Sequence, residues 1–502
     1  MKIVSIKLES PFNSLQPFDK SFKHLVRDDG KIDPICFVGI NGSGKSNLLE
    51  LIVEPFFYLE KIHRFGIKPK KILVKIELIY TKDESSETEV KIETITSKSP
   101  TLSIKLKDSL TWVEILESDE ILKYLPYKII GYTSGMNETL SFRLNQLDED
   151  YSKLVLETAR NQSEVELHDN RMIFLDYPSN EAITVSNFIF RSKNDLKIFN
   201  DLLRINSLHS FKIIINLKRK NKSGKNSLVI LSPELKGNIV KLLNCSICSF
   251  IDETAGYYEL DFLNSPETQT AFKDNFDSVY DLFMCFQKFE LLNPINLEKK
   301  YRKTKSKDLL LEGRPVLAKE DKVFRFDEIF IEITSPKKII PYIGISDGEH
   351  QFLQILGASM IFDKEDILFL FDEPETHFNP LWRTKFINIL NDITKKRNQE
   401  FIITTHSPYI VSDCKGYRVF KFERKGEKVT FDSIDIETYG TSFDLILKKA
   451  FNIDNTISEE ANEEINTLIK EGTEKEITEF LNDSGPSIER LGLIKRLKTI
   501  TS

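Results

Sequence analysis

Glycines, a lysine and a serine stand close together at residues 39–46, where the chain reads Gly-Ile-Asn-Gly-Ser-Gly-Lys-Ser. Glycines allow backbone conformations closed to other residues, so the loop can turn its N–H groups toward an anion. The lysine can reach the outer phosphates of a nucleotide, and the serine hydroxyl can hold Mg²⁺. We therefore predict a nucleoside-triphosphate site for ATP and Mg²⁺, with these binding residues: Gly39, Asn41, Gly42, Ser43, Gly44, Lys45, Ser46 and Asn47.

Two adjacent acids follow the apolar run 367–371, which is typical of a buried parallel strand. Acids buried at a strand end are costly unless a cation or a reacting water uses them. We expect Asp372 to bind Mg²⁺ together with Ser46, and Glu373 to be the catalytic base that orients or deprotonates the attacking water. We expect Lys45 to act in catalysis by absorbing phosphate charge.

A second short apolar strand, residues 401–405, delivers His406 at its end, about thirty residues after the acidic strand end. We interpret this histidine as a catalytic residue that senses the γ-phosphate. A further segment, Ile-Ser-Asp-Gly-Glu-His-Gln at residues 345–351, comes just before the apolar helix pattern 352–361. Its serine and glycine can act as a plain helix cap or as a cradle for an anion.

The elements that must position these residues indicate an α/β protein. The apolar run 35–38 precedes the glycine-rich loop, and apolar residues at helical spacing follow it, which is the strand, loop and helix order that a phosphate-binding loop requires. Strand patterns at residues 2–8, 72–80, 89–95 and 102–106 predict an antiparallel meander beside the site. Residues from about 140 to 300 mix apolar and charged stretches at helical spacing, so we expect a compact, largely helical insertion.

The whole-chain composition describes a mildly acidic protein. Its 502 residues suit two or three domains, 40% are hydrophobic, and the net charge is −7. No run approaches about 18 uninterrupted apolar residues, so we expect no membrane span and a cytoplasmic location. Three basic clusters can be solvated faces or DNA or RNA contacts, and they lie at residues 61–75, 218–225 and 299–307.

Taken in order, the four motifs resemble the ABC-type ATPase heads of the SMC family and of the overcoming-lysogenisation-defect family. By this resemblance residues 39–46 are Walker A, 367–374 are Walker B, 345–351 are the signature motif, and 404–408 carry the switch histidine. The resemblance implies that Ser346 and Gly348 contact nucleotide, although Asp347 and Glu349 depart from the common Leu-Ser-Gly-Gly-Gln. It also makes Asn137 a candidate metal-site amide, in the position of the Q-loop; a strand-ending turn is the alternative.

The resemblance further implies an organisation in four parts. The fold would be an ABC-type P-loop ATPase head, with a mixed sheet core and an antiparallel β meander, plus a largely helical insertion and a short helical C-terminal tail. The parts are an N-terminal lobe at 1–140, an insertion that binds a partner or substrate at 141–310, a C-terminal lobe at 311–445 and the tail at 446–502. In such heads the signature completes the site of the opposite subunit, which implies a head-to-tail homodimer or higher homo-oligomer around ATP.

At the level of biological task, the chain looks most like the ATPase subunits of bacterial anti-phage defence systems, Septu first and PARIS-type ATPases next. This likeness implies an ATP hydrolase that senses infection and acts as a regulatory scaffold for a separate nuclease subunit of HNH or Toprim type. Fewer than about 100 residues follow His406, which is too few for a Toprim domain, so we expect no intrinsic nuclease. The alternative is a DNA repair or maintenance ATPase of the SMC or recombination-mediator kind.

Overall fold

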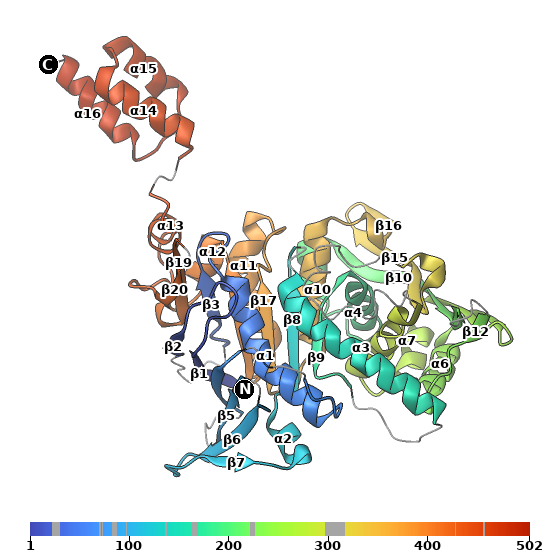
Figure 1. Ribbon diagram of the computed structural model, residues 1–502. Coiled ribbons are helices and arrows are strands. Elements are labelled where there is room, and N and C mark those ends of the chain that lie inside the picture. The colour runs from blue at the N-terminus through green and yellow to red at the C-terminus, as the bar shows by residue number, and fades with distance from the viewer. Residues whose placement is uncertain are drawn as a thin grey trace.

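A mixed seven-stranded sheet forms the centre of the molecule (Figure 1). The computed structural model describes residues 1–22, 31–69, 72, 74–82, 88–96, 98–135, 138–161, 169–220, 226–296, 317–426, 428–454 and 457–501. The strand order is β20 (Lys428–Ser433), β19 (Val419–Lys425), β3 (Ile35–Val38), β18 (Gln399–Thr405), β17 (Ile367–Asp372), β8 (Lys128–Thr133) and β9 (Met172–Phe174). Neighbouring strands are parallel except β19 and β20, which are antiparallel.

Side chains of the central strands alternate between two hydrophobic cores, one on each face of the sheet. Leu368 and Leu370 of β17 join the core under α1 (Lys45–His63), while Phe369 and Phe371 join the core under α10 (Asp347–Ile361) and α11 (Pro380–Thr394). All six residues of β17 are buried, as the uninterrupted apolar run predicts. Because parallel strands align their carboxyl ends, this packing brings the ends of β3, β17 and β18 together at one edge.

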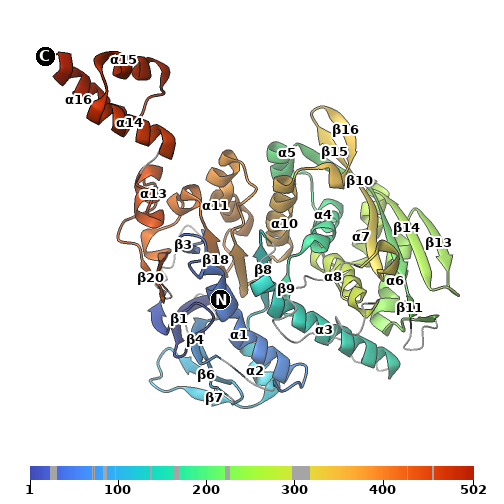
Figure 2. The ribbon, with the colours of Figure 1, turned by 45° about the horizontal axis from the view of Figure 1, so that its top comes forward.

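The predicted antiparallel meander is present as a six-stranded sheet. Its order is β2 (Phe18–Ser21), β1 (Lys2–Leu8), β4 (Ile76–Thr81), β5 (Thr88–Thr94), β6 (Thr101–Leu106) and β7 (Val113–Ile115). The strand expected from residue 72 begins at Ile76. The sheet lies at the lower left of Figure 2, next to α1 and the short α2 (Ser118–Tyr124).

The segment expected to be largely helical also contains a five-stranded antiparallel sheet, which corrects that expectation. The order is β13 (Cys248–Asp252), β14 (Tyr257–Leu263), β10 (Ile205–Asn216), β15 (Phe324–Thr334) and β16 (Lys337–Pro341). Strands β15 and β16 come from beyond residue 310, so the sheet crosses the boundary that we expected there. A two-stranded pair, β11 (Lys218–Lys220) and β12 (Asn226–Leu228), lies beside it.

Helices α4 (Tyr177–Phe190) and α8 (Val279–Glu290) stand between this sheet and the central one. They are accompanied by α3 (Glu138–Arg160), α5 (Lys197–Leu203), α6 (Pro233–Cys245), α7 (Pro266–Asn275) and the 3-10 turns η1 (Asn293–Asn296), η3 (Lys319–Asp321) and η4 (Tyr342–Gly344). Phenylalanines of α8 and β15 pack on each other, with the rings of Phe286 and Phe326 5.1 Å apart. The insertion therefore shares one continuous hydrophobic core with the head.

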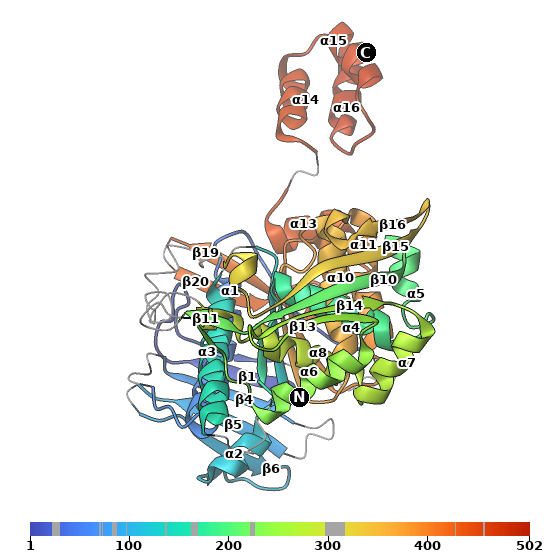
Figure 3. The same cartoon turned by 90° about the vertical axis from the view of Figure 1, so that its right-hand side faces the viewer.

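After β18 the chain forms α12 (Pro408–Ser412), the 3-10 turn η5 (Gly416–Arg418) and, beyond β20, α13 (Phe443–Phe451). Three tail helices follow: α14 (Glu459–Glu471), α15 (Glu474–Asp483) and α16 (Arg490–Thr501). Ile465, Ile477 and Leu493 give these helices a small core of their own, and the bundle stands apart from the body in Figures 1 and 3. In the described part of the chain, each helix is too short or too polar to span a membrane.

Candidate functional site

The glycine-rich loop between β3 and α1 adopts a backbone that only glycine fits. Gly39, Gly42 and Gly44 have φ values of 147°, 73° and 98°. A Cβ at Gly39 would lie 2.7 Å from the Phe422 carbonyl oxygen, and one at Gly44 would lie 2.9 Å from Ser14 Oγ. The loop leads directly into the first turn of the 19-residue helix α1, whose free N–H groups favour an anion.

Other loop residues are oriented in different ways. Asn41 and Gly42 are exposed at the tip, whereas Ser43 is buried, and its Oγ has no hydrogen-bond partner in the described part of the chain. An orphaned hydroxyl inside a phosphate-type loop fits a site built for a polar ligand. Asn47 turns away from the loop and donates to Ser14 Oγ at 2.7 Å. Sequence reasoning missed Arg424, whose guanidinium donates to the Gly42 carbonyl at 3.1 Å.

Lys45 points its ammonium group back over the loop. The Nζ atom donates to the Gly39 carbonyl at 3.0 Å and lies 2.8 Å from His406 Nε2, and the residue is 5% exposed. Burial lowers the pKa of Lys45, and the nearby charges of Glu373 and Asp372 oppose that effect. The structure thus brings the first motif and the switch histidine into direct contact.

Asp372 ends β17 with its carboxylate buried beside Ser46. The carboxylate accepts hydrogen bonds from Thr404 Oγ1 and from the Ser46 side chain, and Thr133 Oγ1 lies 3.5 Å from its Oδ2. Burial raises the pKa of Asp372, and the Thr404 and Ser46 hydrogen bonds oppose the shift. Paired hydroxyl and carboxylate oxygens are the donors that Mg²⁺ prefers, so these residues fit the metal that an ATP site needs.

Glu373 and His406 form a contact at the mouth of the site. Glu373 Oε1 lies 3.0 Å from His406 Nε2, and the two side chains are 34% and 29% exposed. The His406 hydrogen bond lowers the pKa of Glu373, so its carboxylate stays charged at neutral pH. Glu373 has φ of 52°, a left-handed conformation that is uncommon for a residue with a side chain and that recurs at functional sites.

A single nitrogen of His406 therefore faces both Lys45 and Glu373. When Nε2 carries a proton it donates to the Glu373 carboxylate, and when it does not it accepts from the Lys45 ammonium. The two hydrogen bonds exclude each other, so the protonation of Nε2 decides whether His406 bonds to Lys45 or to Glu373.

Glu375 is a site residue that sequence reasoning did not assign. Its side chain is 3% exposed, Oε1 accepts from Thr405 Oγ1, and Oε2 has no hydrogen-bond partner among the described residues. Burial raises the pKa of Glu375 to about 7. Its position two residues after Glu373 was the available signal, but sequence alone does not show that the side chain turns inward.

A cavity of about 510 Å³ opens in front of these groups, within the range of small-ligand sites. Its lining residues come from the glycine-rich loop, the segment after β17, α11, the segment after β18, and the end of α13 with the residues just beyond it: Ile40, Asn41, Glu373, Glu375, Thr376, Arg383, His406, Ser407, Phe451 and Ile453. Among these described lining residues, none comes from the signature segment 345–351.

The signature segment lies at the start of α10. Ser346 caps the helix and is exposed, with its Oγ 2.8 Å from Glu349 Oε2 in a capping box. Gly348 is buried, and a Cβ there would lie 2.5 Å from the His377 carbonyl oxygen. Gln351 in the same helix accepts from the His377 N–H at 3.1 Å and donates to Tyr132 at 2.8 Å. The signature turn is thus tied to the segment after Walker B and to β8.

Several expected features fall outside the described residues. Asn137 does, so no position is assigned to the Q-loop amide; the basic residues 221–225 and 299–307 do as well. In the first basic cluster, Lys61 pairs with Asp150, Arg64 with Glu60 and Lys75 with Glu9. These ion pairs reduce the positive charge that residues 61–75 offer to a nucleic acid.

Comparison with known proteins gives a family. Residues 35–412 match the model of the family described as "AAA domain, putative AbiEii toxin, Type IV TA system", a span that includes all four motifs. A stretch of 94 residues is 34% identical to Protein ea59 of Escherichia phage lambda; it covers 19% of this chain and only 18% of that protein.

Similar solved structures have low sequence identity and low overall superposition. They include the SMC head domain from Thermotoga maritima, at 11% identity and a TM-score of 0.35, with 87% of this chain and 100% of that chain covered. An SMC head bound to the C-winged helix domain of ScpA has 13% identity and a TM-score of 0.36, with 87% and 98% covered. The recombination mediator protein RecF–ATPrS of the RecFOR pathway has 14% sequence identity and a TM-score of 0.36, with 86% of this chain and 97% of that chain covered.

Proposed function

Because the chain belongs to this AAA-domain family, we propose that it binds and hydrolyses ATP as an ABC-type ATPase and dimerises head-to-tail around the nucleotide. The observation that carries the proposal is the meeting of Lys45, Ser46, Asp372, Glu373 and His406 at the aligned ends of β3, β17 and β18. These side chains come from three distant segments, and each has the chemistry that phosphoryl transfer uses.

The residues of the site divide the work of hydrolysis. When bound, Mg-ATP supplies the phosphoanhydride bond that is cleaved. Loop N–H groups and the Lys45 ammonium offer positive charge to phosphate oxygens, and Ser46 and Asp372 offer oxygen ligands to Mg²⁺. The lowered pKa of Glu373 suits it to orienting a water molecule and accepting its proton late, because a strongly ionised carboxylate is a weak base.

The proposed dimer would bring a signature segment to a cavity whose described lining contains none. Ser346 is exposed at the start of α10, and the described lining of the phosphate cavity contains no residue of its segment. A second copy can present that turn to the cavity, and two-fold symmetry then places the turn of the first copy at the cavity of the second. We therefore propose two ATP molecules between two chains, with Ser346 and Gly348 of each facing the nucleotide of the other.

For the biological task, we propose a sensor and regulatory scaffold for a separate nuclease of HNH or Toprim type in anti-phage defence. Two findings support this step. The family description names a putative AbiEii toxin of a Type IV TA system, and the chain shares a 94-residue stretch with a phage protein. Co-purification from the native host, followed by identification of the bound protein, tests the partner. Salt-sensitive, ATP-dependent DNA binding without a nuclease partner would favour a DNA-maintenance role instead.

Glu373→Gln tests the hydrolytic proposal. The amide keeps the size of the side chain but cannot accept a proton, so turnover should fall by about 100-fold or more while ATP affinity stays within about threefold. Glu365→Gln is the matched control, because Glu365 is exposed just before the opposite end of β17. ATP hydrolysis at the wild-type rate in Glu373→Gln would refute the assignment.

A further inference from the structure

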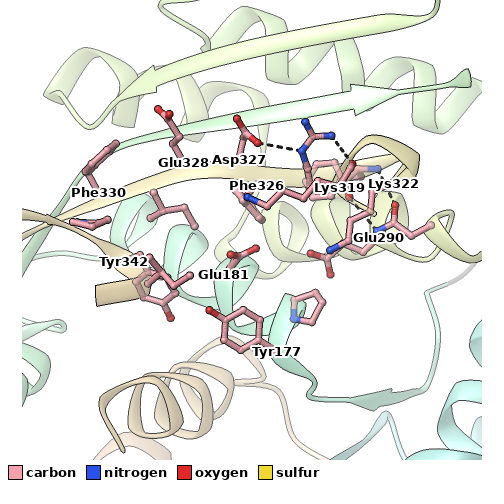
Figure 4. A pocket seen from close by; sticks show the side chains of 17 residues that line it. Tyr177, Glu181, Glu290, Lys319, Lys322, Phe326, Asp327, Glu328, Phe330 and Tyr342 are labelled. Atoms are coloured by element: carbon pink, nitrogen blue, oxygen red, sulfur yellow. Dashed lines mark hydrogen bonds and ion pairs between the residues drawn. The ribbon is translucent and has the colours of Figure 1, made fainter. Parts of the chain in front are cut away.

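A second cavity, of about 310 Å³, lies away from the phosphate loop, between α4, α8 and the β15–β16 hairpin (Figure 4). Tyr177 and Glu181 of α4, Glu290 of α8, Phe326 of β15 and Tyr342 of η4 contribute to its wall. Its volume is within the range of small-ligand sites. Its wall joins polar groups to aromatic rings, the combination that ligand sites use to orient what they bind.

Two carboxylates point into this space without a partner. Glu181 and Glu290 face the interior of the cavity in Figure 4, and within the described residues neither carboxylate has a hydrogen bond or an ion pair. Burial raises the pKa of Glu181 to about 7. Burial, with the charges of Asp176 and Glu181, raises the pKa of Glu290 well above its ordinary value. Unpaired acids held together in this way are costly unless a cation joins them.

The cations already at the cavity form no ion pair with these two acids in the described structure. Arg325 is engaged elsewhere, since its Nε lies 3.2 Å from Asp327 Oδ1 and its Nη1 donates to the Lys319 carbonyl at 2.7 Å. Lys319 and Lys322 line the cavity and lower the pKa of Glu181, and Lys322 also opposes the rise in the pKa of Glu290, but in the described structure no ion pair joins either lysine to these acids.

The donor set also argues against a metal ion. In the described part of the chain, no group of three or more His, Cys, Asp or Glu side chains could hold one. Two carboxylates beside aromatic rings suit a larger and softer cation, because a guanidinium or ammonium group can accept both charges and lie against a ring face.

We propose that this cavity binds an organic cation through a guanidinium or primary ammonium group held between Glu181 and Glu290, with Tyr177 and Tyr342 beside it. A free small amine and the arginine or lysine side chain of a partner segment share this chemistry. No described cation forms an ion pair with either acid, so a cation from outside the fold can still join them.

The cavity wall is mechanically close to the signature turn. Tyr342 lies only four residues before Ser346; its hydroxyl lies 2.9 Å from Thr184 Oγ1, and its ring packs edge-on against His350 of α10 at 4.6 Å. Resting on the proposed function, we infer that an occupant steadies this turn and so promotes the ATP-bound dimer.

Calorimetric titration of the full chain without nucleotide tests the site itself. The probes are agmatine, the peptide acetyl-Gly-Arg-Gly-amide, and the same peptide with uncharged citrulline in place of arginine. We expect one agmatine or one arginine peptide per chain and no binding of the citrulline peptide. Tighter agmatine binding identifies a free amine as the occupant, and tighter peptide binding identifies a partner side chain.

The double variant Glu181→Gln, Glu290→Gln should weaken binding by at least about tenfold, since it removes both negative charges that would hold the cation. Glu320→Gln is the control, because it removes an exposed acid beside the cavity without altering the residues that line it. The affinity of this variant for the cationic probes should stay within about twofold of the wild-type affinity. Failure of both cationic probes to bind, equal binding of the citrulline peptide, or unchanged affinity in the double variant would overturn the proposal.

A second arm tests the coupling. Saturating agmatine should lower by about threefold or more the ATP concentration at which Glu373→Gln dimerises. An unchanged ATP requirement would overturn the coupling alone. If ATP does not dimerise the chain at all, the proposed function fails, whereas calorimetry still decides the cation site.

Discussion

Alanine at position 348 should damage the signature helix without touching the phosphate loop. Gly348 lies in the first turn of α10, two residues after Ser346, and packs against the segment that follows Walker B. The substitution adds one methyl group and removes no hydrogen bond. Its effect therefore reports how closely this turn and the His377 backbone must approach each other.

The size of the effect follows from the distances. A Cβ at position 348 would lie 2.5 Å from the His377 carbonyl oxygen and 3.5 Å from the Trp382 ring. Ordinary contact begins near 3.4 Å, so the helix start or the carbonyl must move by about 1 Å, which typically costs about 1–3 kcal/mol. Alanine recovers up to about 1 kcal/mol of helix propensity. We expect a net loss of about 1–2 kcal/mol, seen as a Tm lower by roughly 1–2 °C for a chain of 502 residues.

Three measurements with one control decide this prediction: thermal unfolding, ATP affinity and ATPase turnover. Turnover in Gly348→Ala should fall at least about tenfold, because a misplacement of about 1 Å can cost 100-fold, while ATP affinity of the isolated chain should not change. Gly344→Ala lies in the turn just before, where a Cβ would meet only Pro341 at 3.8 Å, and should behave as wild type. Wild-type Tm and turnover in Gly348→Ala would refute the reasoning.

Two further substitutions test buried charges. The shift of Glu375 from 4.5 to about 7 corresponds to about 3 kcal/mol. Since the folded state binds the proton more tightly, wild type loses this stability as pH rises from about 4.5 to 7, so Glu375→Gln should be more stable at pH 8 and nearly equal at pH 4.5 in denaturant unfolding. If the difference in unfolding free energy between Glu375→Gln and wild type did not grow with pH, this prediction would be wrong. Arg418→Met should lower the free energy of unfolding, measured by thermal unfolding, by about 3–5 kcal/mol, because it leaves the buried Glu400 carboxylate without its ion-pair partner. Adding Glu400→Leu should restore part of this loss. A further loss of stability in the double variant would contradict the prediction.

The phosphate loop and its partners were predictable because their chemistry is local in sequence. Positive φ at Gly39 and Gly44 follows from residue type and spacing, and parallel strands that end in Asp372 and His406 must deliver those side chains to one edge. The hydrophobic alternation of the strands also predicted the antiparallel sheet beside the site. For these elements, short-range pattern and tertiary structure agree.

What escaped prediction depends on pairing between distant segments. The sheet in the insertion requires β15, which lies beyond residue 310, to pair with β10. The local sequence pattern of β10 does not indicate which distant strand pairs with it. The inward turn of Glu375 and the meeting of Glu181 with Glu290 likewise arise from packing rather than from spacing. Helical spacing, such as that of α8, is by contrast visible within one short stretch of sequence.

Complementation between two inactive chains tests the central claim most directly. Lys45→Ala should fail to hold nucleotide but keeps an intact signature turn, whereas Ser346→Arg should bind nucleotide but cannot complete the site of its partner. Each chain alone should be nearly inactive. Mixed in equal amounts, they should recover roughly a quarter of wild-type ATPase turnover, since half of the random pairs hold one complete site. Full turnover by Ser346→Arg alone as a monomer, with no gain on mixing, would contradict the proposal that each chain completes the other.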